Sequence, residues 1–251
     1  MKEIEFYVKS ALDGTEQPSL FFPADTQGKR PLIVGLHTWS CERRNQITKL
    51  LPLAEKLGFN LLLPEFRGPN LSSNPKCLDA CGSELAKADI IESLDYALSH
   101  YEIDEDSIFL IGGSGGGHMA LLMAGYAPER FKAIASIVPI TDLTKWVNQN
   151  PNYTEHIIAC TGGKESEMLA RSPISYIDCI AKSNLKIFHG KWDKSVPVSH
   201  SIDFYNELIS RHPGATVYLD IFDGGHEMCI EAVELFIVKQ YHKKSEEALT
   251  G

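Results

Sequence analysis

One short stretch constrains the fold of this chain more than any other. In residues 108–118 an apolar run passes into a helical pattern through six residues, five of which are glycine. Gly112, Ser114 and Gly116 satisfy the spacing G-x-S-x-G between a predicted strand and a predicted helix, which is the context this motif requires. Such a turn is so sharp that side chains two residues before and after the serine would collide. The run therefore predicts a tight turn that presents Ser114.

Other glycine-rich loops fit this stretch less well. A dinucleotide-binding loop starting at Gly113 needs glycine at position 118, and a Walker loop starting at Gly112 needs lysine there, whereas the chain has His118. A flexible linker is disfavoured because IFLI and MALLMA flank the run. The remaining alternative is a tight turn whose serine is incidental.

The rest of the chain alternates between two patterns. Short runs rich in β-branched and aromatic residues predict strands, and stretches with helical spacing follow most of the later ones. The predicted strands are 4–8, 19–22, 32–36, 60–63, 108–111, 133–138, 185–188 and 217–222, and helical faces lie within 47–57, 85–98, 119–123 and 202–208. The runs IFLIG and AIASIV are apolar throughout, as in parallel strands covered on both faces. We predict an α/β protein with a mostly parallel eight-stranded sheet, helices on both faces and ligands at the carboxyl ends of the strands.

Length and composition predict one domain over residues 1–251. Of the 251 residues 43% are hydrophobic, and 24 Lys and Arg against 33 Asp and Glu give a formal net charge of −9. This acidity argues against nucleic acid or an anionic membrane as partner, because phosphate contacts need a basic face. No apolar run approaches the roughly 18 to 20 residues of a membrane span, and the N-terminus has no signal core, so we expect a cytoplasmic protein. The oligomeric state stays open.

The cysteines predict neither a disulfide framework nor a metal site. Six cysteines in 251 residues are too sparse for a disulfide-framed fold. The closest pair, Cys77 and Cys81, lies in a polar loop without a second pair to complete a zinc site. We expect reduced, mostly structural thiols; whether Cys77 and Cys81 interact stays open.

A serine at such a turn needs a base, and the base needs a third group to fix its tautomer. Asp193 follows the predicted strand LKIF, and His226 follows VYLDIF, before the last helix. We favour Asp193 over Asp223 as the acid, because Asp223 is too near His226 in sequence to reach behind its ring and more plausibly shapes the turn. Asp220 is a weaker rival.

Several stretches together resemble one family. GGSGGGHMALL, HGKWDKSVPVSHS, FDGGHE, PEFRG and ELAKADIIESLDYAL are similar to the catalytic domain of prolyl-oligopeptidase-like serine hydrolases of the α/β-hydrolase superfamily, in order over residues 31–226. The resemblance implies an α/β-hydrolase fold with Ser114 as nucleophile, Asp193 as the orienting acid and His226 as general base and then acid.

The resemblance also bears on the substrate. Peptidases of the family usually carry a β-propeller, and four blades of about 40 residues would leave too few residues for the hydrolase. We therefore expect a bare catalytic domain, cofactor-independent, that cleaves carboxylic esters of small substrates through an acyl-enzyme. The alternative is a small aminopeptidase or acyl-peptide hydrolase, followed by an acyltransferase. A non-catalytic binding protein is disfavoured because all three triad positions are filled.

The oxyanion hole and the substrate pocket are predicted from neighbouring residues. By position, the backbone N–H groups of Trp39 and Gly115 hold the oxyanion; relatives commonly have glycine where this chain has Thr38. Residues 141–184 contain no long apolar helix pair, which predicts at most a small cap and an open site. The residues that we expect to line the pocket are His37, Thr38, Trp146 and Trp192, with Tyr153 as a further aromatic wall. Arg67 and Glu65 are interpreted as structural.

Overall fold

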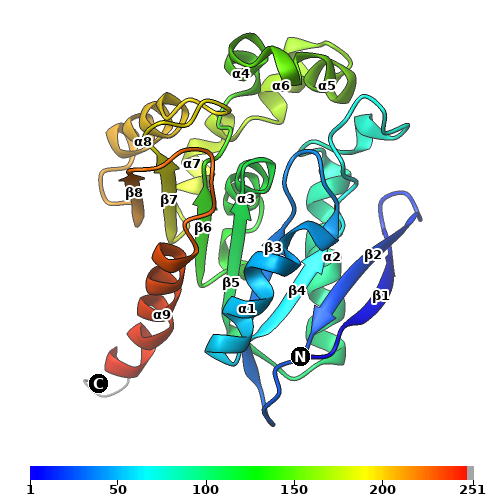
Figure 1. The fold of residues 1–251 in the computed structure, drawn as a ribbon, viewed down its shortest axis with the longest axis vertical. Coiled ribbons are helices and arrows are strands. Elements are labelled where there is room, and N and C mark those ends of the chain that lie inside the picture. The colour runs from blue at the N-terminus through cyan, green and yellow to red at the C-terminus, as the bar shows by residue number, and fades with distance from the viewer. Residues whose placement is uncertain (248–251) are drawn as a thin grey trace.

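Eight strands form one sheet in the computed structural model, which describes residues 1–247 (Figure 1). The strands are β1 Ile4–Lys9, β2 Glu16–Phe22, β3 Arg30–Leu36, β4 Asn60–Pro64, β5 Ile103–Gly113, β6 Ala133–Ile137, β7 Leu185–Gly190 and β8 Val217–Phe222. Their order across the sheet is β1-β2-β4-β3-β5-β6-β7-β8. The β1–β2 and β2–β4 pairs are antiparallel and the others are parallel. This confirms the predicted mostly parallel eight-stranded α/β-hydrolase fold.

Helices cover both faces of this sheet. They are α1 Ile47–Leu57, α2 Glu84–His100, α3 Gly115–Tyr126, α4 Leu143–Gln149, α5 Pro151–Thr161, α6 Glu165–Ala170, α7 Ile177–Ile180, α8 Ser199–Arg211 and α9 Ile230–Glu247. Helices α1 and α9 pack on one face, where Leu50 and Phe236 belong to the same buried core. On the other face α2, α3 and α8 share a second core that contains Leu94, Leu121 and Phe204. The central strands β3, β4 and β6 are therefore almost entirely buried, as the apolar runs in the sequence predict, whereas the edge strands β1 and β8 are partly exposed.

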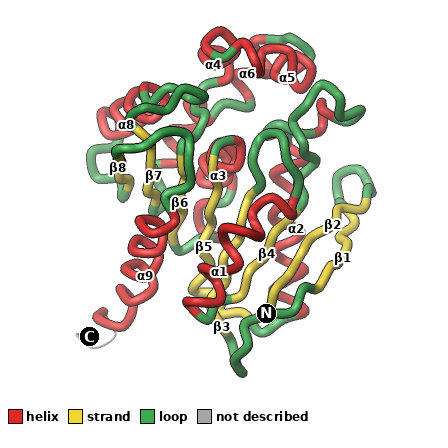
Figure 2. The backbone as a smooth tube through the Cα atoms, in the orientation of Figure 1, coloured by secondary structure: helices red, strands yellow, loops and turns green. Residues whose placement is uncertain are grey.

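Three short helices lie beyond the carboxyl ends of the strands. Helices α4, α5 and α6, within residues 141–184, cluster at the top of the molecule (Figure 2). They enclose a third buried core, which includes Trp146, Ile157 and Met168 and also Trp39 from the loop after β3. The longest of the three has 11 residues. The segment thus places a small helical layer beside the loops that follow the strands.

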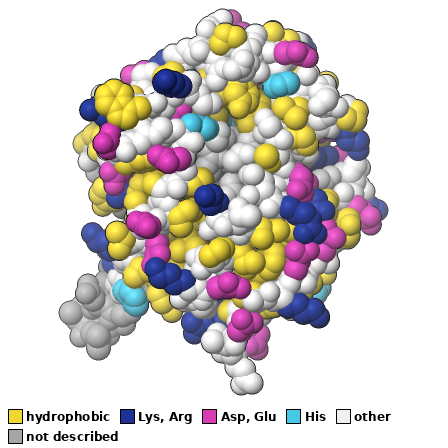
Figure 3. Space-filling view, in the orientation of Figure 1, with side chains coloured by type: hydrophobic (Ala, Val, Ile, Leu, Met, Phe, Trp, Pro, Cys, Tyr) yellow, Lys and Arg dark blue, Asp and Glu magenta, His cyan; other side chains and the backbone are white. Residues whose placement is uncertain are grey.

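The surface is mixed in charge. Lys and Arg side chains are interspersed with Asp and Glu on the face seen in Figure 3. Across the described residues, no helix combines the length and the apolar character needed to cross a membrane.

Candidate active site

Ser114 occupies the sharp turn between β5 and α3. Its backbone has φ 57° and ψ −119°, in the positive-φ region that side chains rarely adopt. The glycines on both sides are required by contact: a Cβ on Gly112 would come 2.0 Å from the carbonyl oxygen of Gly116, and one on Gly116 would come 2.5 Å from that of Leu36. The Ser114 N–H donates to the Ile137 carbonyl at 2.9 Å, which ties the turn to β6. The turn therefore has the steric cause that the sequence predicts.

His226 and Asp193 come from loops after the last two strands and meet at Ser114. His226 Nε2 lies 2.9 Å from Ser114 Oγ, and its Nδ1 lies 2.7 Å from Asp193 Oδ2. The other carboxylate oxygen, Oδ1, accepts the N–H groups of Ser195 and Val196 at 2.8 and 2.9 Å. An acid, a histidine and a serine thus form one continuous line of contacts, although they are far apart in sequence.

Asp193 is buried, and its surroundings favour the carboxylate. Burial alone would raise its pKa, but the contacts with His189 and His226 and the Val196 N–H outweigh burial and hold the pKa below its usual range. His189 Nε2 lies 3.4 Å from Asp193 Oδ2, and its Nδ1 lies 2.7 Å from Ser201 Oγ. Sequence reasoning did not single out His189; its position, four residues before Asp193 at the end of β7, is the signal that could have found it.

The rival carboxylate, Asp223, has a different partner. Its Oδ1 accepts the indole N–H of Trp192 at 2.8 Å, and the Trp192 N–H donates to the Gly224 carbonyl at 2.9 Å. These bonds close the turn before His226, whose Nδ1 faces Asp193 instead. Asp223 thus shapes the turn.

Two backbone amides approach each other beside Ser114. A Cβ on Gly115 would come 2.4 Å from the backbone nitrogen of Trp39, so the loop after β3 and the start of α3 are in close contact. Gly115 is the first residue of α3, where an amide has no partner within the helix. The carbonyl of Trp39 accepts the Asn70 N–H at 2.8 Å, which fixes the loop from the opposite side. Both predicted oxyanion donors therefore lie next to the serine.

A cavity of about 440 Å³ opens at Ser114. It is lined by Thr38, Trp39, Ser40, Lys49, Gly113, Ser114, Val138, Tyr153, His226, Glu227 and Met228. A more polar cavity of about 470 Å³ shares Ser40 and Tyr153 with it and is completed by Asn150, Asn152, His156, Lys194 and Ser195. Lys49, Glu227 and Met228 were not predicted. Lys49 lies far in sequence from the motifs, whereas Glu227 and Met228 directly follow His226, and this adjacency is the signal that could have found them.

Of the four residues expected to line the pocket, the structure brings only Thr38 to this cavity. His37 is buried and points toward Glu65. Trp146 is fully buried between the cap helices, where its indole N–H donates to the Ser195 carbonyl at 3.0 Å. Trp192 is 61% exposed on the turn after β7. His37 and Trp192 lie beside catalytic loops in sequence, but this proximity does not determine which way their rings point.

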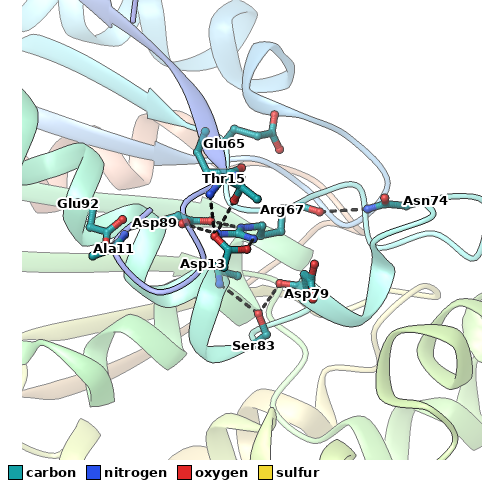
Figure 4. A network of polar contacts seen from close by, with 12 residues as sticks. Ala11, Asp13, Thr15, Glu65, Arg67, Asn74, Asp79, Ser83, Asp89 and Glu92 are labelled. Atoms are coloured by element: carbon teal, nitrogen blue, oxygen red, sulfur yellow. Dashed lines mark hydrogen bonds and ion pairs between the residues drawn. The ribbon is translucent and has the colours of Figure 1, made fainter. Parts of the chain in front are cut away.

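Arg67, one of the two residues interpreted as structural, forms ion pairs with two aspartates. Arg67 contacts Asp13 and Asp89 in a network that joins the loop after β4 to α2 and the β1–β2 turn (Figure 4). The hydrogen bonds to Asp89 raise the pKa of Arg67. Burial opposes this rise, the bonds to Asp13 add to it, and the net shift is upward. In turn the bonds from Arg67 and Thr15 hold the pKa of Asp13 below its usual range. The interpretation of Arg67 as structural agrees with these contacts.

Cys77 and Cys81 both lie against Cys160 of α5, and all three are free thiols. The contact with Cys81, together with burial, raises the pKa of Cys160, so its thiol stays neutral. In the part of the chain that the structure describes, no group of three acidic, histidine or cysteine side chains could hold a metal ion. The thiols join the cap to the loop before α2 by packing.

Comparison with known proteins gives a family. A model described as the prolyl oligopeptidase family matches residues 79–244. Acylamino-acid-releasing enzyme 2 of Oryza sativa subsp. japonica is 26% identical over 242 residues, which cover 87% of this chain and 30% of that protein. The acylamino-acid-releasing enzyme of Homo sapiens is 27% identical over 170 residues, covering 62% of this chain and 23% of that protein. The chain thus spans less than a third of these relatives.

Solved structures show the same fold. An acylaminoacyl peptidase of Pyrococcus horikoshii superposes with a TM-score of 0.75 at 19% sequence identity, over 96% of this chain and 42% of that one. Another, an acylaminoacyl peptidase in complex with Z-Gly-Gly-Phe-chloromethyl ketone, gives a TM-score of 0.73 at 21% identity, over 98% of this chain and 41% of that one.

Proposed function

This chain belongs to the prolyl oligopeptidase family of serine hydrolases, as its motifs predicted. From this we propose that it hydrolyses N-acylated peptides through an acyl-enzyme on Ser114. The observation that carries the proposal is the line of contacts from Asp193 through His226 to Ser114 at the edge of a cavity. In this proposal Asp193 orients His226 and stabilises its charged form.

The chemistry follows from these contacts. His226 Nε2 takes the proton of Ser114 Oγ as the oxygen attacks the substrate carbonyl carbon. The N–H groups of Trp39 and Gly115 hold the negative oxygen of the tetrahedral intermediate. His226 then gives the proton to the leaving amine, which departs and leaves the acyl group on Ser114. Water, deprotonated by His226, attacks the acyl-enzyme, and the acid leaves while Ser114 regains its proton.

The choice of an acylated peptide over a small ester has two supports. Several relatives carry the name acylamino-acid-releasing enzyme, which favours the acyl-peptide alternative over the carboxylesterase that the sequence alone led us to expect. The polar cavity that adjoins the first one through Ser40 and Tyr153 offers amide and cationic groups to a longer substrate. An ester with a short acyl chain would leave this second cavity unfilled.

A panel of chromogenic substrates tests the proposal. We expect kcat/KM for an N-acetylaminoacyl nitroanilide to exceed that of the same anilide with a free amine by at least about tenfold, equal to 1.4 kcal/mol of differential transition-state binding. A nitrophenyl butyrate ester serves as the small-ester comparison.

Ser114→Ala is the matched control, since it removes one oxygen and leaves the cavity otherwise intact. It should abolish turnover of every substrate in the panel. If the protein hydrolyses only the ester, its function is that of a carboxylesterase. A preference for the anilide with the free amine would indicate an aminopeptidase. Full activity of Ser114→Ala would refute the serine mechanism.

A further inference from the structure

His37 directly follows β3 and points away from the cavity, toward the end of β4. Its ring is fully buried and stacks on Phe66, with the ring centroids 3.7 Å apart. Nδ1 lies 3.0 Å from the Thr38 carbonyl oxygen, and Nε2 lies 3.1 Å from Glu65 Oε1. Nε2 and Oε1 are both buried, and neither forms a hydrogen bond within the described residues, so the two groups meet as a close polar contact. The ring therefore bridges the ends of two neighbouring strands.

The carbonyl that His37 contacts belongs to the same peptide group as the N–H of Trp39. In a trans peptide the C=O and N–H lie in one plane and point in opposite directions; the Thr38–Trp39 bond is not among the cis peptides of the chain. A donor that holds the Thr38 oxygen therefore also sets the direction of the Trp39 N–H. That amide nitrogen lies beside Gly115, the other candidate oxyanion donor.

The other hydrogen bond to the Thr38 oxygen is longer, because the Cys41 N–H reaches it at 3.3 Å. The preceding peptide, His37–Thr38, is held separately, since the Thr38 N–H donates to Asn45 Oδ1 at 3.2 Å. The His37 ring is also confined on its open side, because a Cβ on Gly68 would come 2.2 Å from His37 Cε1. His37 is thus the nearest donor to the Thr38 oxygen and has little freedom to turn.

Glu65 fixes the other end of the ring. Burial alone would raise the pKa of Glu65, but the contacts with His37 and the Arg43 N–H outweigh burial and lower it, so the carboxylate is retained. Its Oε2 accepts the Arg43 N–H at 3.1 Å, which leaves Oε1 directed at His37. The carboxylate is anchored and can orient the imidazole.

We propose that His37, oriented by Glu65, is a positioning residue that aims the Trp39 N–H at the oxyanion. This inference rests on the proposed function, in which Trp39 and Gly115 hold the tetrahedral intermediate. His37 touches neither the substrate nor Ser114 and acts only through the Thr38–Trp39 peptide. Loss of the His37 side chain should reduce the stabilisation of the transition state and leave substrate binding nearly unchanged.

Four substitutions separate the parts of this role. His37→Phe keeps the stacked ring and removes the donor, whereas His37→Asn places an amide N–H near the position of Nδ1. Glu65→Leu removes the partner of the ring, whereas Glu65→Gln can donate to Nε2 and still accept the Arg43 N–H. The full chain is assayed with an acylaminoacyl nitroanilide, and binding of a peptide boronic acid, which forms a tetrahedral adduct on serine, is measured alongside.

We expect His37→Phe and Glu65→Leu to lower kcat by about 10- to 100-fold, because complete loss of one oxyanion donor costs about 10²- to 10³-fold. KM should change little, boronate affinity should fall in parallel with kcat, and His37→Asn and Glu65→Gln should recover most of the loss. His200→Phe is the matched control: it replaces another buried histidine, one that contacts Thr141 and Gln149, and should leave kcat unchanged.

Equal kcat in wild type and in folded His37→Phe, or a loss that His37→Asn does not recover, would overturn the inference. The proposed function would still stand in that case if Ser114→Ala is inactive. A wild type without any hydrolysis would overturn both. If His37→Phe fails to fold, the pair Glu65→Leu and Glu65→Gln decides by the same kcat and boronate readouts.

Discussion

Among the histidine–carboxylate contacts at the carboxyl edge of the sheet, the pairs His226–Asp193 and His37–Glu65 differ in what the second ring nitrogen faces. In the first pair His226 contacts Asp193, and its side chain is 28% exposed, with Nε2 turned to the hydroxyl of Ser114. In the second, His37 contacts Glu65, its side chain is 0% exposed, and Nδ1 faces a carbonyl. A hydroxyl can exchange a proton with imidazole and a carbonyl can only accept a hydrogen bond. The same two residue types therefore suit proton transfer in one place and positioning in the other.

The largest effect should come from the His226–Asp193 pair. His226→Ala removes the general base, and we expect kcat for an acylaminoacyl nitroanilide to fall by about 10⁶-fold, the scale of losing a triad histidine. His37→Phe, with its much smaller expected loss, is the direct comparison. Steady-state kinetics on both folded variants measures the difference, and losses of similar size would mean that the two pairs do not differ in role.

A smaller effect is expected at the acid. Asp193→Asn keeps the shape of the side chain but favours the wrong tautomer of His226, and kcat should fall by about 10⁴-fold. Asp223→Asn is the matched control because Asp223 bonds to Trp192 on the turn, and its kcat should stay at the wild-type value. A greater loss at Asp223 than at Asp193 would exchange the roles of the two carboxylates.

The smallest effect concerns stability against pH. The pKa of Asp193 is lowered on folding, so its carboxylate stabilises the fold above about pH 4, and this contribution is lost as pH falls through the folded-state pKa. Asp193→Asn lacks this titration. Its free energy of unfolding, measured by denaturant titration, should therefore fall less steeply below about pH 4 than that of the wild type. Parallel curves would show that Asp193 is not held as a buried carboxylate.

The sheet could be predicted because its strands are short apolar runs between turn signals. The missed strand ends are polar: β5 begins at Ile103 and continues through Asp104 and Glu105 before the apolar run. Acidic residues there gave no strand signal, and pairing of Ile103 with Arg30 of β3 supplies the reason for the extension. Sheet pairing overrides local propensity at such positions.

The loops carrying Ser114, Asp193 and His226 could be ordered from sequence because each follows a strand at the same edge of the sheet. The direction of a side chain whose partner lies on a neighbouring strand could not be predicted from sequence. His37 was expected to line the pocket because it is close to Trp39 in sequence, yet its ring faces Glu65, since β3 and β4 are adjacent in the sheet. Trp146 was misplaced for a similar reason, because its indole partner is the Ser195 carbonyl on another loop.

The central claim is that Ser114 is the nucleophile, and one measurement tests it most directly. The protein is treated with a fluorophosphonate, digested, and the modified peptide is identified by mass spectrometry. We predict a single adduct on the peptide that contains Ser114, with no labelling of Ser114→Ala. Labelling at another residue, or an unlabelled wild type that still hydrolyses the acylaminoacyl substrate, would contradict the account.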